Sequence, residues 1–166
     1  MLKILTIIFI STFLLNAKET PKYTDEIHNA VRSNNIEILN HTIKKFKSSI
    51  NKKDKFGFTP LHLAVRINDI KIVEELLKYK VEVNTKDNFG DTPLIESARI
   101  NNMEILKLLI CKGANKDEKN NQGQNVMNFI SINKQYEVAL FIQEPQCGED
   151  ITDKKKQLID RLRELE

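Results

Sequence analysis

Two cysteines are the residues of this 166-residue chain with the widest choice of chemistry. Cys111 and Cys147 do not form a Cys-x-x-Cys pair, so neither a thioredoxin-like motif nor a zinc site is indicated. The pair could form a disulfide in an oxidising compartment, or one cysteine could act as a reactive thiol. A reactive thiol needs a positive environment that lowers its pKa, and no such group is specifically placed near either cysteine.

Other residue types with catalytic potential do not form a recognisable constellation. His28, His41 and His62 are not at metal-ligand spacing, and Glu74 and Glu75 are predicted to lie on a solvated helix surface. The chain has no Gly-x-Gly-x-x-Gly, Walker loop, His-Glu-x-x-His or Gly-x-Ser-x-Gly motif. We therefore expect no catalytic residue, no metal site and no cofactor, and a protein that is not an enzyme.

A segment that repeats after 33 residues indicates the architecture. Residues 51–61 and 84–94 share Asn, Lys-Asp, Phe-Gly and Thr-Pro-Leu at matching positions, and the match extends to residues 68 and 101. A period of 33 that contains Thr-Pro-Leu-His resembles the ankyrin repeat family. The resemblance implies an all-α solenoid of about four helix-turn-helix repeats, which exposes an extended surface and does not enclose a reaction.

The two central repeats carry the motif, and the terminal repeats are degenerate. The resemblance gives an ankyrin domain over residues 18–144, with repeats 18–50, 51–83, 84–116 and 117–144. The first repeat lacks Thr-Pro and needs one extra residue to keep register. Atypical terminal repeats are expected because one side of an end repeat faces water.

Each repeat should begin with a turn and continue into two helices. Glycine recurs at residues 57, 90 and 123, where a positive φ costs it little. Thr59 and Thr92 are predicted helix N-caps, each followed by proline at the first helical position. By resemblance to the family, His62 should hydrogen-bond the Thr59 cap region. Apolar residues at helical spacing in 70–77 and 103–110 predict the second helices. Gly113 predicts a C-cap, which should be weaker in the preceding repeat, where Lys80 takes its place.

The resemblance also locates an expected partner-binding face, because ankyrin proteins bind other proteins through turn tips and the exposed side of the first helix. The matching positions here are Lys55, Phe56, Phe58, Arg66, Ile67, Asn88, Phe89, Asp91, Arg99 and Ile100. Aromatic residues and arginine are enriched at binding hot spots. Phe56 and Phe89 could instead pack between neighbouring turns, whereas Phe58 has no aromatic counterpart one repeat later and is the better candidate for a contact.

The ends of the chain predict export and a short tail. A positive start, an apolar run over residues 4–15 and Ala17 are typical of a secretory signal at residues 1–17, with an uncleaved anchor as the alternative. In the tail, 145–166, Leu158, Leu162 and Leu165 predict an amphipathic helix. That helix could cap the last repeat or bind a partner, or the tail could be frayed.

The function that these observations favour is binding of another protein, by a monomer in the periplasm. The formal net charge of +3 is dispersed, so nucleic acid is not implied, and no membrane segment follows the signal. Alternatives are an accessory protein for an exported enzyme, for which resemblance to small bacterial ankyrin proteins suggests catalase, and a secreted effector that binds a host protein. In an oxidising compartment a Cys111–Cys147 bridge would fix the tail to the third repeat.

Overall fold

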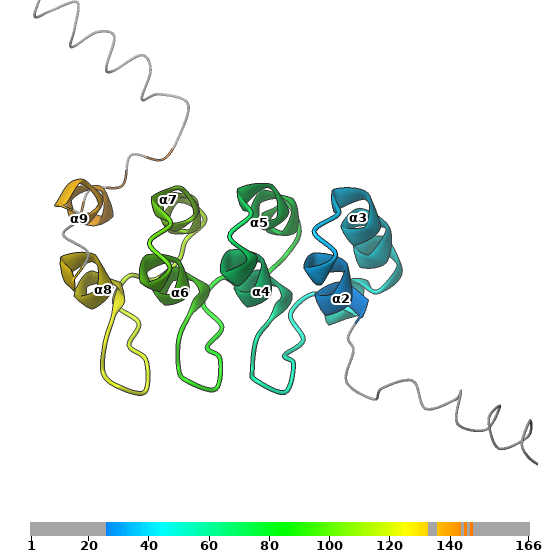
Figure 1. Cartoon of the computed structure of the whole chain (residues 1–166), viewed down its shortest axis with the longest axis horizontal. Coiled ribbons are helices and arrows are strands. Elements are labelled where there is room, and N and C mark those ends of the chain that lie inside the picture. The colour runs from blue at the N-terminus through cyan, green and yellow to red at the C-terminus, as the bar shows by residue number, and fades with distance from the viewer. Residues whose placement is uncertain (1–25, 133–135, 144, 146, 148–166) are drawn as a thin grey trace, which may run out of the picture.

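The computed structural model describes residues 26–132, 136–143, 145 and 147, and within them eight α-helices stack as four pairs in a row (Figure 1). The inner helices are α2 (Glu26–Arg32), α4 (Pro60–Ile67), α6 (Pro93–Arg99) and α8 (Val126–Ile132). The outer helices are α3 (Ile36–Lys45), α5 (Ile70–Leu77), α7 (Met103–Cys111) and α9 (Tyr136–Gln143), with a 3-10 turn η1 (Lys47–Ser49) after α3. The expected all-α solenoid is confirmed.

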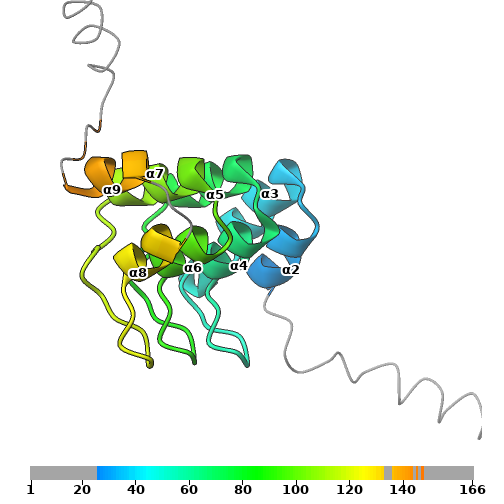
Figure 2. The same cartoon turned by 60° about the vertical axis from the view of Figure 1, so that its left-hand side comes forward.

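The inner and outer helices form two layers, and three long turns project from the inner layer. Figure 2 shows these turns side by side below α4, α6 and α8. Each turn precedes one inner helix, so the turns repeat with the same period as the helix pairs. This arrangement places the turn tips and the inner helices on one continuous side of the molecule.

The inner helices begin at the predicted caps. Thr59 accepts a hydrogen bond from the backbone N–H of His62, and the His62 ring accepts one from the Thr59 N–H, which completes a capping box. Thr92 caps α6 in the same way, without the reciprocal bond. In α8, Asn128 replaces histidine, and its Oδ1 accepts from the Asn125 N–H at 2.9 Å. The capping role expected for His62 is therefore confirmed.

Asparagine makes the tight turn between the two helices of a repeat. Asn34, Asn68 and Asn101 all have positive φ, between 50° and 64°, a conformation that asparagine tolerates better than most residues. The next residue is an N-cap of the outer helix in each case, as Asp69 is for α5. Gly113 follows α7 with φ +86°, as its predicted C-cap role requires.

The core lies between the layers and continues through all four pairs. It is lined by apolar residues at the helical spacing that the sequence predicts, among them Leu39, Ile43, Ile72, Leu76, Ile105, Leu106, Leu109, Ile130 and Ile142. Neighbouring pairs are also joined on their outer side by equivalent asparagines. Asn51 accepts from the Glu82 N–H at 2.9 Å, and Asn84 accepts from the Asn115 N–H at 2.8 Å. The period of 33 residues is thus built into the contacts between repeats.

The predicted signal peptide (1–17) and the predicted tail helix lie outside the described residues. Among the described helices, none has the length and hydropathy needed to cross a membrane.

Candidate binding face

The turn tips are held by an acidic or amide side chain that folds back on its own turn. Asp54 Oδ1 accepts from the backbone N–H groups of Phe56 and Phe58, at 2.9 and 3.0 Å. Asp87 and Asn120 make the same pair of bonds in the next two turns. A short polar side chain that satisfies two backbone donors fixes the turn conformation. Each tip therefore presents its outermost residues in a defined position.

A ladder of backbone hydrogen bonds joins the tips. The Asn88 N–H donates to the Phe56 carbonyl at 3.1 Å, and the Asn121 N–H donates to the Phe89 carbonyl at 3.0 Å. The Asn88 side chain adds a bond to the Lys55 carbonyl. Gly57 and Gly90 permit this approach, because a Cβ at Gly90 would lie 2.5 Å from Asn121 Oδ1. The ladder makes the three tips one rigid row.

Two phenylalanines are exposed on this row. Phe56 is 48% exposed and Phe89 is 62% exposed, and they occupy equivalent positions in successive tips. The Lys55 ammonium lies 4.8 Å from the centroid of the Phe56 ring. Neither ring is packed between neighbouring turns, which was the alternative that the sequence left open. Large exposed aromatic side chains in a rigid row are typical of a contact surface.

Phe58 and Asp91, two of the predicted contact residues, are instead buried. Phe58 is 8% exposed and belongs to the hydrophobic core. Its ring packs against Phe56 and His62, and the Arg66 guanidinium covers it at 4.8 Å. Asp91 is 1% exposed and is paired with Arg99. The prediction that Phe58 stands free at the tip was wrong, because Arg66 from the following helix covers its ring.

Each of the first three inner helices has an arginine in its last turn. Arg32, Arg66 and Arg99 have side chains that are 47%, 46% and 43% exposed. Their acidic partners lie beneath them, with side-chain exposures of 8% for Asp54, 5% for Glu96 and 1% for Asp91. The acids are therefore covered and the cations are outermost. We call Phe56, Phe89 and these three arginines, with Ile67 beside them, the inner face.

Glu96 is a buried acid beneath the inner face that the sequence analysis missed. It is 3% exposed, lies 2.7 Å from Arg66 and 3.8 Å from Arg99, and stands where the preceding repeat has Leu63. Burial raises the pKa of the Glu96 carboxyl, and the charges of the two arginines act in the opposite direction. The mismatch between Leu63 and Glu96 within the repeat was the signal that could have found it.

The remaining predicted positions fall at the margins of the inner face. Lys55 and Asn88 are exposed at the tips, Ile67 is 37% exposed at the end of α4, and Ile100 is half-buried against the core. Repeat four continues the surface through Phe129, whose ring lies 5.1 Å below the Arg99 guanidinium. The structure thus leaves the arginines and the outer phenylalanines exposed, and it removes Phe58 and Asp91 from the exposed set.

Two of the three histidines, His28 and His62, have structural partners. His62 Nε2 lies 3.1 Å from the Asp91 carbonyl, and His28 Nε2 lies 2.7 Å from the Phe58 carbonyl, so each ring joins its own repeat to the next turn. Desolvation lowers the pKa of His62. Within the described residues, no cluster of three or more His, Cys, Asp or Glu side chains could hold a metal ion.

The two cysteines meet on the outer side of the last repeats. The Sγ atoms of Cys111, at the end of α7, and Cys147, beyond α9, are 2.03 Å apart, with Cα atoms 5.2 Å apart. Of the two alternatives that the sequence left open, the disulfide is therefore the one present. It connects the segment after α9 to the third repeat and leaves no free thiol.

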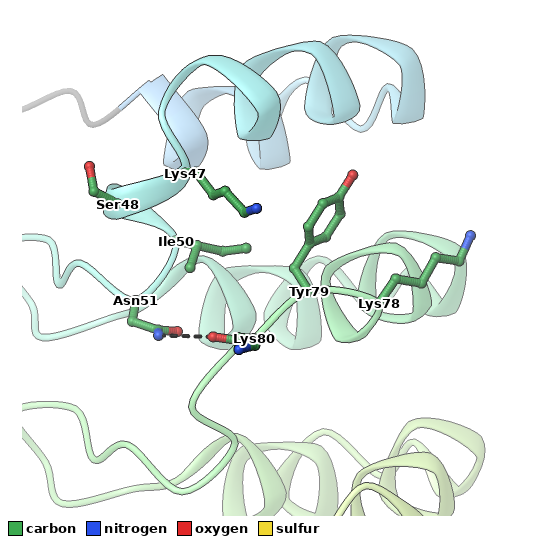
Figure 3. A pocket seen from close by; sticks show the side chains of 7 residues that line it. All are labelled: Lys47, Ser48, Ile50, Asn51, Lys78, Tyr79 and Lys80. Atoms are coloured by element: carbon green, nitrogen blue, oxygen red, sulfur yellow. Dashed lines mark hydrogen bonds between the residues drawn. The ribbon is translucent and has the colours of Figure 1, made fainter.

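A pocket lies between the first two helix pairs, lined by the segments that follow α3 and α5. Figure 3 shows Lys47 directed toward Tyr79, and Lys78 directed away. Several polar groups of this pocket already have partners, since Tyr79 donates to Asn40 and Asn51 donates to the Lys80 carbonyl. These bonds connect the repeats, and they give the pocket a structural role.

The stacked pairs, the joined tips and the open inner face define a helical repeat solenoid. The chain belongs to the ankyrin repeat family, since a sequence model of ankyrin repeats (three copies) matches residues 27–120 and 80–155. It is also similar to the putative ankyrin repeat protein FPV018 of Fowlpox virus (strain NVSL), with 41% identity over 51 residues. That match spans 31% of this chain and 7% of the viral protein.

Proposed function

We propose that this chain is a non-enzymatic module that binds another protein through the inner face. The observation that carries the proposal is the exposure of Phe56 and Phe89, 48% and 62%, on a rigid row of tips. Exposed aromatic rings contribute strongly to binding when a partner buries them. The half-exposed arginines beside them are the other residue type enriched at hot spots.

The structural roles of the reactive residue types support a non-enzymatic function. His62 is engaged in a cap and in a bond to the next repeat, and the two cysteines are paired. Buried groups with satisfied hydrogen bonds serve stability better than proton transfer. The inner face keeps Phe56 and Phe89 exposed, which suits recognition of a partner.

The location that we propose is outside the cytoplasm, in the periplasm. The signal-like residues 1–17 support export, and a paired Cys111 and Cys147 suit an oxidising compartment. Fractionation of cells that express the full chain, with sequencing of the mature N-terminus, tests this proposal. A periplasmic chain that begins near Lys18 supports it. A chain in the membrane fraction with an intact start indicates an anchor, and a chain in the medium indicates secretion.

Position-specific crosslinking tests the binding face. A photoreactive amino acid is placed at Phe56, at Phe89 or, as a matched control on an outer helix, at Lys71, which is also exposed. We expect the same discrete protein adduct from both tip positions and not from Lys71. Equal adducts from all three positions, or an adduct from Lys71 alone, would place the partner elsewhere.

A further inference from the structure

We infer that the partner's docking segment is an extended, acidic stretch of protein whose carboxylates bind the arginines of the inner face. This inference rests on the proposed protein-binding function and names the chemistry of the partner. Five exposed or half-exposed side chains of the inner face carry it: Phe56, Arg66, Arg99, Phe89 and Arg32.

A chain of contacts joins Phe56, Arg66 and Arg99. The Phe56 ring packs against Phe58 at 5.9 Å between centroids, and Arg66 covers the other ring. Arg66 donates to Glu96 at 2.7 Å, and Glu96 lies 3.8 Å from Arg99. The aromatic tip and two arginines are therefore parts of one surface.

The arginines retain capacity for a ligand. A guanidinium carries five N–H donors, and among the described residues Arg66 uses one of them in a hydrogen bond and Arg32 uses two. These remaining donors belong to side chains that are about half exposed, whereas the paired acids are covered. Arginine forks of this kind bind carboxylates in bidentate fashion.

The first long turn exposes positive charge. Lys52, Lys53 and Lys55 are exposed in the first long turn, whereas Asp87 and Asp91 in the second are buried. A cationic surface with apolar side chains in it favours an acidic segment that also carries aliphatic or aromatic residues. The exposed Phe56, Phe89 and Ile67 would cover those apolar residues.

The spacing of the arginines predicts the spacing of the acids. Arg66 and Arg99 lie at equivalent positions of adjacent inner helices, and packed helices are about 8–10 Å apart. A chain in the extended polyproline II conformation advances about 3.1 Å per residue and has three residues per turn, so every third side chain lies on the same face. Carboxylates three residues apart would therefore match neighbouring arginines, with apolar residues between them.

Fluorescence polarisation with a synthetic peptide tests this inference. The probe is a labelled peptide with Glu at every third position and Leu, Ser or Phe between them, and the control peptide has Gln in place of each Glu. We expect binding of the Glu peptide that is about tenfold tighter than that of the Gln peptide and that weakens as salt is raised. Equal binding of the two peptides would overturn the inference.

Variants of the chain distinguish binding by these arginines from nonspecific electrostatic attraction between the protein and the peptide. Arg66→Gln with Arg99→Gln should weaken the Glu peptide about tenfold, whereas Lys71→Gln on an outer helix should not. Arg66→Lys with Arg99→Lys keeps the charge and should give an intermediate loss, because lysine lacks the fork. An equal loss of affinity in Lys71→Gln would show that the peptide is attracted by overall charge and not by a specific site, and it would contradict the inference.

Glu96→Gln gives the opposite expectation and guards against misfolding as an explanation. It removes the internal carboxylate that competes for Arg66 and Arg99, so the Glu peptide should bind about threefold tighter. Unchanged or weaker binding by a folded Glu96→Gln variant would contradict the inference. Stronger binding of a single-stranded oligonucleotide than of the Glu peptide would assign the arginines to phosphate instead.

The crosslinking and peptide experiments together distinguish a wrong partner chemistry from a wrong binding face. Adducts from Phe56 and Phe89 together with no preference for the Glu peptide would leave a binding face with a different partner chemistry. Absence of tip-specific adducts would remove the face itself.

Discussion

The Arg66 guanidinium lies over the ring of Phe58, with 4.8 Å between Cζ and the ring centroid. One repeat later the arginine is kept as Arg99, and its partner becomes the buried carboxylate of Asp91. The two pairings are different solutions to the same task, since each holds an arginine half exposed on the inner face. Phe58 and Asp91 therefore support the face from below and do not form its surface.

The first prediction concerns the two kinds of phenylalanine in the turns. Phe58→Ala should lower the free energy of unfolding by about 3 kcal/mol, because it leaves a cavity in the core and removes the ring on which Arg66 lies. Phe89→Ala should change it by less than about 0.5 kcal/mol, since its ring is 62% exposed. Urea denaturation followed by circular dichroism measures both. Equal losses from the two variants would contradict this assignment of buried and exposed rings.

The repeat framework could be predicted from the sequence because its signals are local. Thr59 with Pro60 starts a helix through bonds within four residues, and a period of 33 then extends that conclusion to the neighbouring repeats. The orientation of Phe58 depends on Arg66 from the next helix, which no local pattern reports. Glu96 was missed because an acid on an inner helix is predicted to be solvated until its arginine partners from two repeats are known.

A second prediction separates backbone strain from close approach at the turn glycines. Gly90 and Gly123 both have positive φ, +78° and +73°, but only at Gly90 would a Cβ meet the next turn. Gly123→Ala should cost about 1 kcal/mol through strain alone. Gly90→Ala should cost at least about 2 kcal/mol, because the Asn121 backbone must also move. Thermal unfolding of the two variants measures the difference, and equal melting temperatures would show that the ladder between tips is not closely packed.

Our third prediction is that stability falls in mild acid through His62. Its pKa is lowered by burial in the folded chain, so the unfolded chain binds the proton more readily. The stability that neutral His62 gives the folded chain is therefore complete above the unfolded pKa of about 6.5 and is lost as the pH falls below that value. Protonation of Nδ1 would also remove the acceptor of the Thr59 N–H.

The variant His62→Asn isolates this effect, because Asn128 performs the same cap in α8. The variant should be about 1 kcal/mol less stable at neutral pH, because it loses the hydrogen bond to the Asp91 carbonyl. It should also show a shallower fall in stability between neutral and mildly acidic pH than the wild-type chain. Parallel pH profiles of the two proteins, measured by urea denaturation, would show that His62 does not titrate in this range.

The fourth prediction concerns the disulfide. Closing a loop of 36 residues stabilises a chain by about 4 kcal/mol if the whole effect is entropy of the unfolded state. Reduction, or Cys111→Ser with Cys147→Ser, should lower the melting temperature measured by calorimetry. The inner face should keep its affinity for the partner, because the bridge lies on the outer side. Two free thiols in protein purified without reductant would contradict the pairing.

The affinity of the crosslinked partner for variants of the turn tips and of the outer helices tests the central claim most directly. The partner is identified from its adducts with the tips, purified, and titrated against the wild-type chain, Phe56→Ser with Phe89→Ser, and the outer-helix control Lys71→Ser with Lys107→Ser. We predict that the tip variant binds at least about tenfold more weakly with an unchanged melting temperature, and that the control binds as the wild type does. Unchanged binding by the tip variant, with a loss in the outer-helix control, would contradict binding through the inner face.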